Sequence, residues 1–318
     1  MSWIYYIRMT AACAVFFVLT GCAAADKKEA SPLQVKGSEM RAAGVVAYGS
    51  GDYARAQTLL VEALRLDRSV DNRKGELIDL INLARLSLVM DDGAGAQAWL
   101  ADAISLATVA KDDAGLSQVY ATLARADYIS GRPDDALKHI GAALAIDAST
   151  GVKSGANLNL KAEALIASGM YEQASAVLKD ALKINLDAGD VLETSNTYRA
   201  MAEAGLAQGS DAAALDYYKK AYEVSRESGN SARLVRDLTA ISAIEIKTGR
   251  NVEALFSLKR LYAVASASGM MKEAAYALDR LVSLNEAAGS AEQADFYRNL
   301  KADLLQAKTG EKKEDGGR

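Results

Sequence analysis

Glycines recur along this chain at a nearly constant interval. They stand at positions 131, 151, 169, 189, 209, 229, 249, 269 and 289, so that seven of the eight steps are 20 residues and one is 18. Gly51 and Asp91 continue a 40-residue spacing toward the N-terminus. A glycine just past the end of a helix adopts a left-handed backbone conformation that other residues resist. The intervening segments are rich in Ala and Leu, so the pattern predicts helices of about 15–17 residues separated by regular stops.

Small residues recur at a 40-residue interval, which predicts how these helices pair. Alanine stands at seven aligned positions, and twelve residues before each stands a small or modest residue. Another alanine follows seven residues later in five cases, and a bulky residue follows four residues later in six. The aligned alanines are Ala56, Ala96, Ala136, Ala174, Ala214, Ala254 and Ala294. Because small residues allow two helix backbones to approach closely, we expect about seven antiparallel helix pairs.

These units resemble tetratricopeptide repeats in a longer, 40-residue form. The segments GDYARAQTLLVEAL (51–64) and GMYEQASAVLKDAL (169–182) match the family pattern almost throughout, whereas other units lose its first aromatic residue. The resemblance implies an all-α fold, a right-handed α-solenoid of about seven helix-turn-helix repeats over residues 37–306. The alternative, a generic helical bundle, does not require a stop every 20 residues.

The N-terminus is typical of an exported protein. Met9–Leu19 is apolar, but it is shorter than the roughly 20 residues that span a bilayer. Leu19–Cys22 (LTGC) resembles the lipobox of bacterial lipoproteins, which implies a signal peptide over residues 1–21 and a multiply acylated Cys22 as membrane anchor. Two alternatives are an ordinary signal peptide cut after one of residues 23–25 and an uncleaved anchor.

The resemblance also implies where such a lipoprotein resides. Ala23, not Asp, follows the cysteine, and by analogy with enterobacterial sorting this predicts the outer membrane, facing the periplasm, with the inner membrane as alternative. Residues 22–36 have the composition of a flexible tether, and residues 307–318 that of a disordered tail.

The resemblance implies a partner-binding groove lined by the first helix of each repeat. In the family, residues at fixed positions of that helix face the concave side, and here these positions carry arginines in the first repeats and glutamates in the middle ones. We therefore expect a groove that is basic toward the N-terminus and acidic in the middle, and that binds a protein or peptide segment. The expected groove residues are Arg41, Tyr48, Arg85, Arg125, Tyr128, Asn159, Glu163, Arg199 and Glu203. The alternative is that these residues form an ordinary solvated surface, with Arg199 and Glu203 paired as i,i+4 neighbours.

Several classes of site are not supported. The two-carboxylate clamp of chaperone adaptors is not reproduced, because Arg41, Val45, Ile81 and Arg85 stand where it needs Lys and Asn. The chain has a formal net charge of −4 with interspersed signs, so we expect no nucleic-acid partner. We expect no catalytic residue, no metal site and no cofactor. His139 fits a surface or interhelical position and Trp99 fits a packing position.

The residues thus favour a non-enzymatic protein. The leading hypothesis is a lipid-anchored periplasmic scaffold for protein–protein interactions in an envelope assembly, such as pilus or secretion, outer-membrane or cell-wall machinery. The alternative is a sensor that folds around short peptides, as some regulators with 40-residue repeats do.

Overall fold

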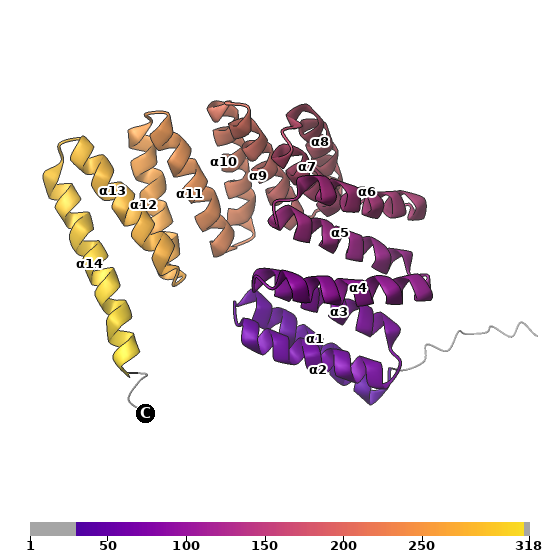
Figure 1. Cartoon of the computed structure of the whole chain (residues 1–318). Helices are drawn as coiled ribbons and strands as arrows, with labels where there is room; N and C mark the ends of the chain where they lie inside the picture. Colours follow the sequence, from indigo (N-terminus) through magenta and orange to yellow (C-terminus); the bar gives the residue numbers. More distant parts are fainter. Residues whose placement is uncertain (1–29, 315–318) are drawn as a thin grey trace, which may run out of the picture.

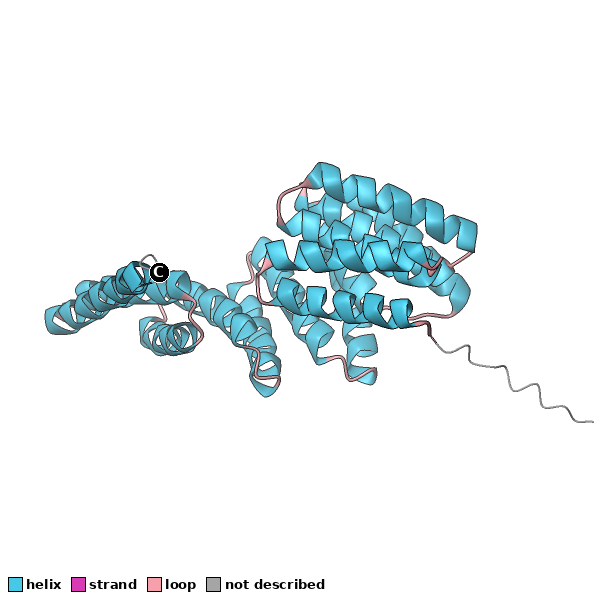
Figure 2. Cartoon of the chain, turned by 90° about the horizontal axis from the view of Figure 1, so that it is seen from below, coloured by secondary structure: helices cyan, strands magenta, loops and turns pink. Residues whose placement is uncertain are grey.

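The computed structural model describes residues 30–314, with side chains placed up to residue 306, and this part of the chain is helical without strands (Figures 1 and 2). The described helices are α1 (Pro32–Gly49), α2 (Tyr53–Ser69), α3 (Arg73–Val89), α4 (Gly93–Ala110), α5 (Asp113–Ile129), α6 (Pro133–Thr150), α7 (Gly155–Ala167), α8 (Tyr171–Asp187), α9 (Val191–Ala207), α10 (Asp211–Glu227), α11 (Ser231–Lys247), α12 (Asn251–Ala267), α13 (Met271–Ala287) and α14 (Ala291–Glu314). They form seven successive helical pairs, which confirms the predicted all-α solenoid.

The predicted stops are the helix ends. Every glycine from Gly131 to Gly289 in the series has a positive φ, between 64° and 75°. Where the series lacks glycine, Asp71, Asp91 and Lys111 adopt the same left-handed conformation, with φ of 51°, 59° and 52°. The 20-residue interval therefore runs unbroken from position 51 to position 151, although only glycine made it visible in the sequence.

The residue after each stop is the N-cap of the next helix, except after Gly151, where Ser154 caps α7. In six turns this residue is Asp or Asn, and its side chain accepts a hydrogen bond from the backbone N–H three residues later, as Asp92 does from Gly95 at 2.9 Å. Its own N–H donates back to the carbonyl five residues earlier, as from Asp92 to Ser87 at 2.8 Å. A left-handed residue followed by a capping residue thus reverses the chain in two positions.

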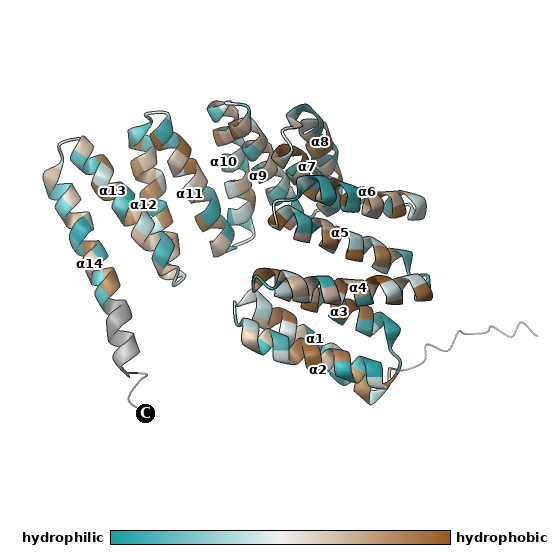
Figure 3. Ribbon diagram, viewed as in Figure 1, coloured by the Kyte–Doolittle hydropathy of each residue, from teal (hydrophilic) through white to brown (hydrophobic). Residues whose placement is uncertain are grey.

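The alanine series lies where the paired helices cross. All seven aligned alanines are 0% exposed, and so are the five that follow them by seven residues. The bulky residues between them, from Leu60 to Leu258, are buried as well. Figure 3 shows hydrophobic and hydrophilic residues alternating around each helix, as expected when one face packs and the other meets solvent.

The order of the helices creates an inner and an outer surface. Each of α1, α3, α5 and α7 contacts the next odd-numbered helix, whereas even-numbered helices make no comparable contact with one another. From α1 to α9 the odd-numbered helices therefore lie closer to one another than the even-numbered helices do, as on the inner side of a curved stack. Figure 1 shows the whole stack as an open arch. We call the exposed face of the odd-numbered helices the inner surface and the face carried by the even-numbered helices the outer surface.

The two ends of the solenoid differ from the predicted boundaries. Helix α1 begins at Pro32, capped by Ser31, so residues 32–36 are not part of a flexible tether. Proline at the first helical position and the reciprocal Ser31–Gln34 hydrogen bonds explain this early start. Helix α14 continues to Glu314, so the predicted disordered tail is helical over residues 307–314. The predicted signal peptide, Cys22 and residues 315–318 lie outside the described part.

The last helix, α14, carries charged residues at positions where other repeats have packing residues. Arg298 and Lys301 occupy positions that hold bulky or small packing residues in other repeats. Arg298 forms ion pairs with Glu286 and Asp295, and Lys301 Nζ lies 2.6 Å from Asp279 Oδ1. A polar terminal helix is what the exposed end of a solenoid requires.

Candidate functional site

The inner surface carries part of the predicted groove set. Its central row is the ninth position of each repeat, where the described side chains are all partly or fully exposed. These residues are Val45, Arg85, Arg125, Glu163, Glu203, Ala243 and Ser283. This row therefore lies on the accessible face of the odd-numbered helices.

Arg85 is an arginine of the inner surface whose charge has no ion-pair partner among the described residues. It is exposed on α3, and no carboxylate among the described residues forms an ion pair with it. Although part of the side chain meets solvent, the surrounding protein displaces water from around the guanidinium and so lowers the pKa of Arg85, and the nearby Tyr48 opposes this effect. Tyr48 is exposed on α1, with its ring centroid 6.0 Å from that of Tyr53. A guanidinium beside an accessible aromatic ring can receive a carboxylate of a bound segment.

The middle of the inner surface is internally balanced. Arg125 on α5 forms an ion pair with Glu163 on α7, and its guanidinium lies 5.8 Å from the ring centroid of Tyr128. Arg236 on α11 approaches Glu203 on α9 at 3.4 Å. The predicted acidic middle is therefore neutralised by arginines from neighbouring helices. The expected alternative pairing of Arg199 with Glu203 is wrong, because Glu203 meets Arg236 instead.

The ion pairs link neighbouring helices on this surface, Arg125 also contacts the ring of Tyr128, and the same groups influence one another's pKa values. Burial raises the pKa of Tyr128, and the carboxylates of Glu163 and Glu203 raise it further. Burial likewise raises the pKa of Glu203, which Arg236 opposes. The tyrosine, the two glutamates and their arginines thus form a continuous polar strip across α5, α7, α9 and α11.

Three predicted groove residues lie inside the structure. Asn159 and Arg199 are each 2% exposed, and the side chain of Arg41 is 15% exposed. They occupy the fifth position of the repeat. Four residues along a helix correspond to a net rotation of about 40°, so the fifth position is turned away from the ninth and toward the adjacent repeat. Asn159 and Arg199 are therefore packing residues between repeats and do not line the groove.

These inward side chains form polar networks between repeats. Arg199 Nε and Nη2 lie 2.6 and 2.9 Å from the Asp237 carboxylate, and Ser225 Oγ donates to the same carboxylate at 2.8 Å. Thr197 Oγ1 donates to Asn159 Oδ1 at 2.8 Å.

The first repeat contains a network in the same register. Arg41 Nε lies 2.6 Å from Asp79 Oδ1, and Arg41 Nη2 bonds Asp67. Both carboxyl groups are 0% exposed and share this one guanidinium, so ionisation of both would place two buried negative charges beside a single positive one. Burial, reinforced by Asp67, raises the pKa of Asp79 to about 7 despite Arg41.

The single histidine and Trp99 have the packing roles expected of them. His139 lies between helices, with Nδ1 2.6 Å from Asp127 Oδ2 and its ring stacked on Tyr120 at 6.3 Å between centroids. Trp99 packs on the cluster around Leu100. Among the side chains of residues 30–306, no group of His, Cys, Asp and Glu could hold a metal ion.

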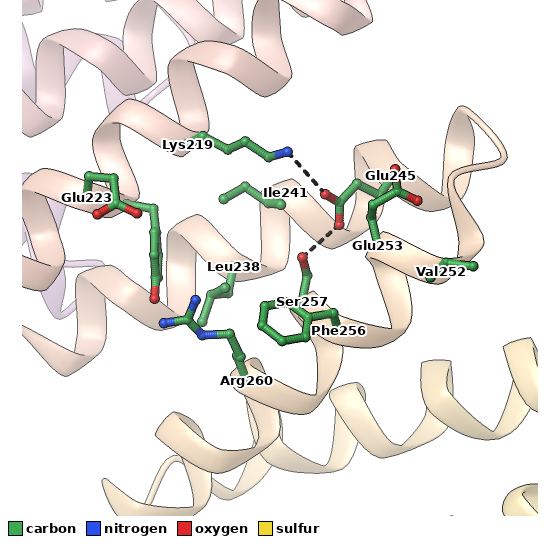
Figure 4. Close-up of a pocket in the computed structure, with 11 residues that line it drawn as sticks. Lys219, Glu223, Leu238, Ile241, Glu245, Val252, Glu253, Phe256, Ser257 and Arg260 are labelled. Atoms are coloured by element: carbon green, nitrogen blue, oxygen red, sulfur yellow. Dashed lines mark hydrogen bonds and ion pairs between the residues drawn. The ribbon is translucent and has the colours of Figure 1, made fainter.

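Sequence reasoning missed a pocket on the outer surface. It has a volume of about 490 Å³ and lies between α10 and α12, with α11 as its floor (Figure 4). Its walls include Tyr222, Leu238, Ile241 and Phe256, with the buried Glu245 at one end. One feature of the sequence could have indicated the pocket: Ser257 stands at a repeat position where every other repeat carries a larger side chain.

Comparisons with known proteins agree with the repeat architecture. Residues 154–227 match the family model described as tetratricopeptide repeat. No curated protein matches the sequence at a significant level. Within the described part of the chain, every helix is too short or too polar to cross a lipid bilayer.

Solved structures with the same fold cover most of the chain. One is a signal transduction ATPase from Pyrococcus horikoshii with a tetratricopeptide repeat sensor, at TM-score 0.64 and 18% identity; the match covers 86% of this chain and 43% of that one. A Rap protein complexed with Competence and Sporulation Factor matches at TM-score 0.59 and 13% identity, covering 89% of each chain. The pilF protein of Pseudomonas aeruginosa matches at TM-score 0.52 and 19% identity, covering 74% of this chain and 99% of that one. At these identities the likeness concerns the fold.

Proposed function

Because the chain is a tetratricopeptide-repeat protein, we propose that it is a non-catalytic docking scaffold whose inner surface binds an acidic segment of a partner protein. The observation that carries this proposal is Arg85, which is exposed on the inner surface beside Tyr48 without an ion-pair partner among the described residues. A carboxylate of the partner would gain two parallel hydrogen bonds from the guanidinium and contact area from the ring. A repeat solenoid offers an extended binding surface of this kind.

Charge reversal at Arg85 tests the docking proposal. We expect Arg85→Glu to weaken binding of fluorescent acidic peptides by roughly tenfold or more, since it replaces attraction with repulsion. The measurement is a fluorescence titration at two salt concentrations, with basic and neutral peptides as comparison. Arg55→Glu is the matched control, because Arg55 is an exposed arginine on the outer helix α2. Equal binding by both variants and the unchanged protein would contradict the role of Arg85.

A second candidate function is a sensor that closes around a short peptide. The observation that favours it is the likeness to the Rap protein complexed with Competence and Sporulation Factor along 89% of both chains. A sensor should contract when it binds peptide, and a scaffold should keep its curvature. Small-angle X-ray scattering of the purified protein with and without a bound acidic peptide distinguishes them: a fall in radius of gyration supports the sensor, and an unchanged radius supports the scaffold.

We further propose that acylated Cys22 anchors this scaffold to the outer membrane on its periplasmic side, where it serves an envelope assembly. The LTGC motif supports the anchor, and the charged segment that follows it would separate the solenoid from the lipid. Two or more acyl chains give durable attachment.

Fractionation of cell envelopes tests the anchor. We expect Cys22→Ala to move the protein from the membrane fraction to the soluble fraction and to abolish incorporation of a labelled fatty acid. Cys13→Ala is the matched control, since Cys13 would leave with the signal peptide and the variant should remain attached. Retention of Cys22→Ala in membranes would show that another segment anchors the chain.

A further inference from the structure

The outer-surface pocket exists because one repeat lacks a large side chain. The residue three positions after each aligned alanine lies on the even-numbered helix and is never fully exposed. In the seven repeats this residue is Leu59, Trp99, His139, Val177, Tyr217, Ser257 and Tyr297. Ser257 is the smallest of the seven, and it is followed in the next repeat by Tyr297 and preceded by Tyr217.

Neighbouring repeats show what occupies the equivalent space. In the fifth repeat Tyr217 stands there, beside Gly205, and the hollow between α8, α9 and α10 is reduced to about 270 Å³. In the seventh repeat Tyr297 stands there and is 6% exposed. The sixth repeat, between them, retains about 490 Å³. The pocket therefore has a place for an aromatic ring that the chain itself does not supply.

The carboxylate of Glu245 lies at the inner end of this space as a hydrogen-bond acceptor. Glu245 of α11 is 1% exposed, accepts a hydrogen bond from Ser257 Oγ at 2.7 Å and lies 3.6 Å from Lys219 Nζ. In the third repeat the equivalent pair is Asp127 and His139, where the ring nitrogen lies 2.6 Å from the carboxylate. A ring that donates to an acid of the odd-numbered helix is thus already part of this fold.

Arg260 at the rim of the pocket could make a second contact with a bound partner. Arg260 lies between two aromatic rings, with its guanidinium 5.0 Å from the centroid of Tyr222 and 5.7 Å from that of Phe256. The two acids nearest the rim, Glu223 and Glu253, form ion pairs with Arg226 and Arg250 instead. The two rings hold Arg260 at the pocket lining, and it forms no ion pair among the described residues, which suits a carboxylate next to the inserted ring. Phe256, at 64% exposed, is an accessible wall for that ring (Figure 4).

We infer that this pocket binds a partner protein through an inserted tyrosine or tryptophan side chain that donates a hydrogen bond to Glu245, with an adjacent acidic residue on Arg260. The inserted ring of the partner takes the place that Tyr217 and Tyr297 occupy in the neighbouring repeats. This site lies on the opposite face from Arg85, so the scaffold holds two partners, or two segments of one partner, at the same time.

Filling the pocket from within tests the inference. The probes are N-acetyl amides of tyrosine, tryptophan, phenylalanine and leucine and the peptide acetyl-Asp-Tyr-Asp-amide, followed by NMR of the purified full chain. We expect the tyrosine and tryptophan probes to bind about tenfold more tightly than the phenylalanine probe, since only they can donate to the buried carboxylate. Ser257→Tyr, which copies the neighbouring repeats, should fold normally and abolish binding. Ser149→Tyr is the matched control, because Ser149 is exposed at the end of α6.

Two further variants separate the parts of the site. Glu245→Gln should reduce the preference for tyrosine over phenylalanine, and Arg260→Gln should reduce the gain from the flanking aspartates without altering that preference. Equal binding of all four amides, or binding that survives Ser257→Tyr in a folded protein, would overturn the inference. Because Arg85→Glu leaves this face unchanged, loss of inner-surface docking and loss of this site are measured independently.

Discussion

Replacing Arg199 with methionine is expected to lower the free energy of unfolding by about 3–5 kcal/mol. The side chains of Arg199 and Asp237 are 3% and 0% exposed, and the guanidinium bonds the carboxylate through two nitrogens. Methionine preserves much of the volume but leaves a buried carboxylate with Ser225 as its remaining close donor in this network. Urea unfolding followed by helix ellipticity measures the loss. Hydrogen exchange should locate it in α9 to α12, because a repeat contacts only its neighbours.

Two comparisons show whether the loss comes from the uncompensated charge. Arg236→Met removes an adjacent arginine whose side chain is 64% exposed, and we expect it to cost less than about 1 kcal/mol. The double variant Arg199→Met, Asp237→Leu removes both charges, and it should recover most of the lost stability. A small effect of Arg199→Met alone, or no recovery in the double variant, would show that the network contributes little.

Replacing Asp79 with asparagine is expected to stabilise the protein above neutral pH by about 2–4 kcal/mol, in proportion to the upward shift of its pKa. Burial and the adjacent Asp67 raise the pKa of Asp79 to about 7, from the ordinary value of 3.8. Below about pH 4 the carboxyl is protonated in both folded and unfolded chains and costs nothing. As the pH rises from about 4 to about 7, the unfolded chain ionises first, so the stability of the unmodified protein falls.

The pH dependence distinguishes this cause from a general packing effect. The difference in unfolding free energy between Asp79→Asn and the unmodified protein should grow by up to about 1.4 kcal/mol per pH unit across this window and then level off. Asp102→Asn is the control, because Asp102 is 59% exposed and should give a flat difference. A flat difference for Asp79→Asn would mean that Arg41 compensates both carboxylates.

The repeat architecture could be predicted because it depends on local chemistry. Positive φ at Gly131 and the other stops requires glycine or tolerates few alternatives, and close helix crossing at Ala56 and its equivalents requires a small residue, so both leave periodic traces. The same reasoning placed Arg85 and Glu163 on one accessible face. Asp71 and Lys111 escaped notice because residues other than glycine took the left-handed conformation.

The fate of each charge was decided by tertiary structure. Arg41, Arg85, Arg125 and Arg199 are alike in the sequence, yet one remains uncompensated on the surface and another is sealed against Asp237 from the next repeat. The fifth and ninth positions differ by a rotation of about 40° around the helix, which decides whether a side chain meets the next repeat or the accessible face. The acids that pair with Arg41, Arg125 and Arg199 each lie 38 residues away along the chain. The sequence by itself determined where the chain turns and which residues must be small. Only the stacking of repeats decided which polar groups meet, because pairing energy depends on distance and exclusion of water between segments that are remote along the chain.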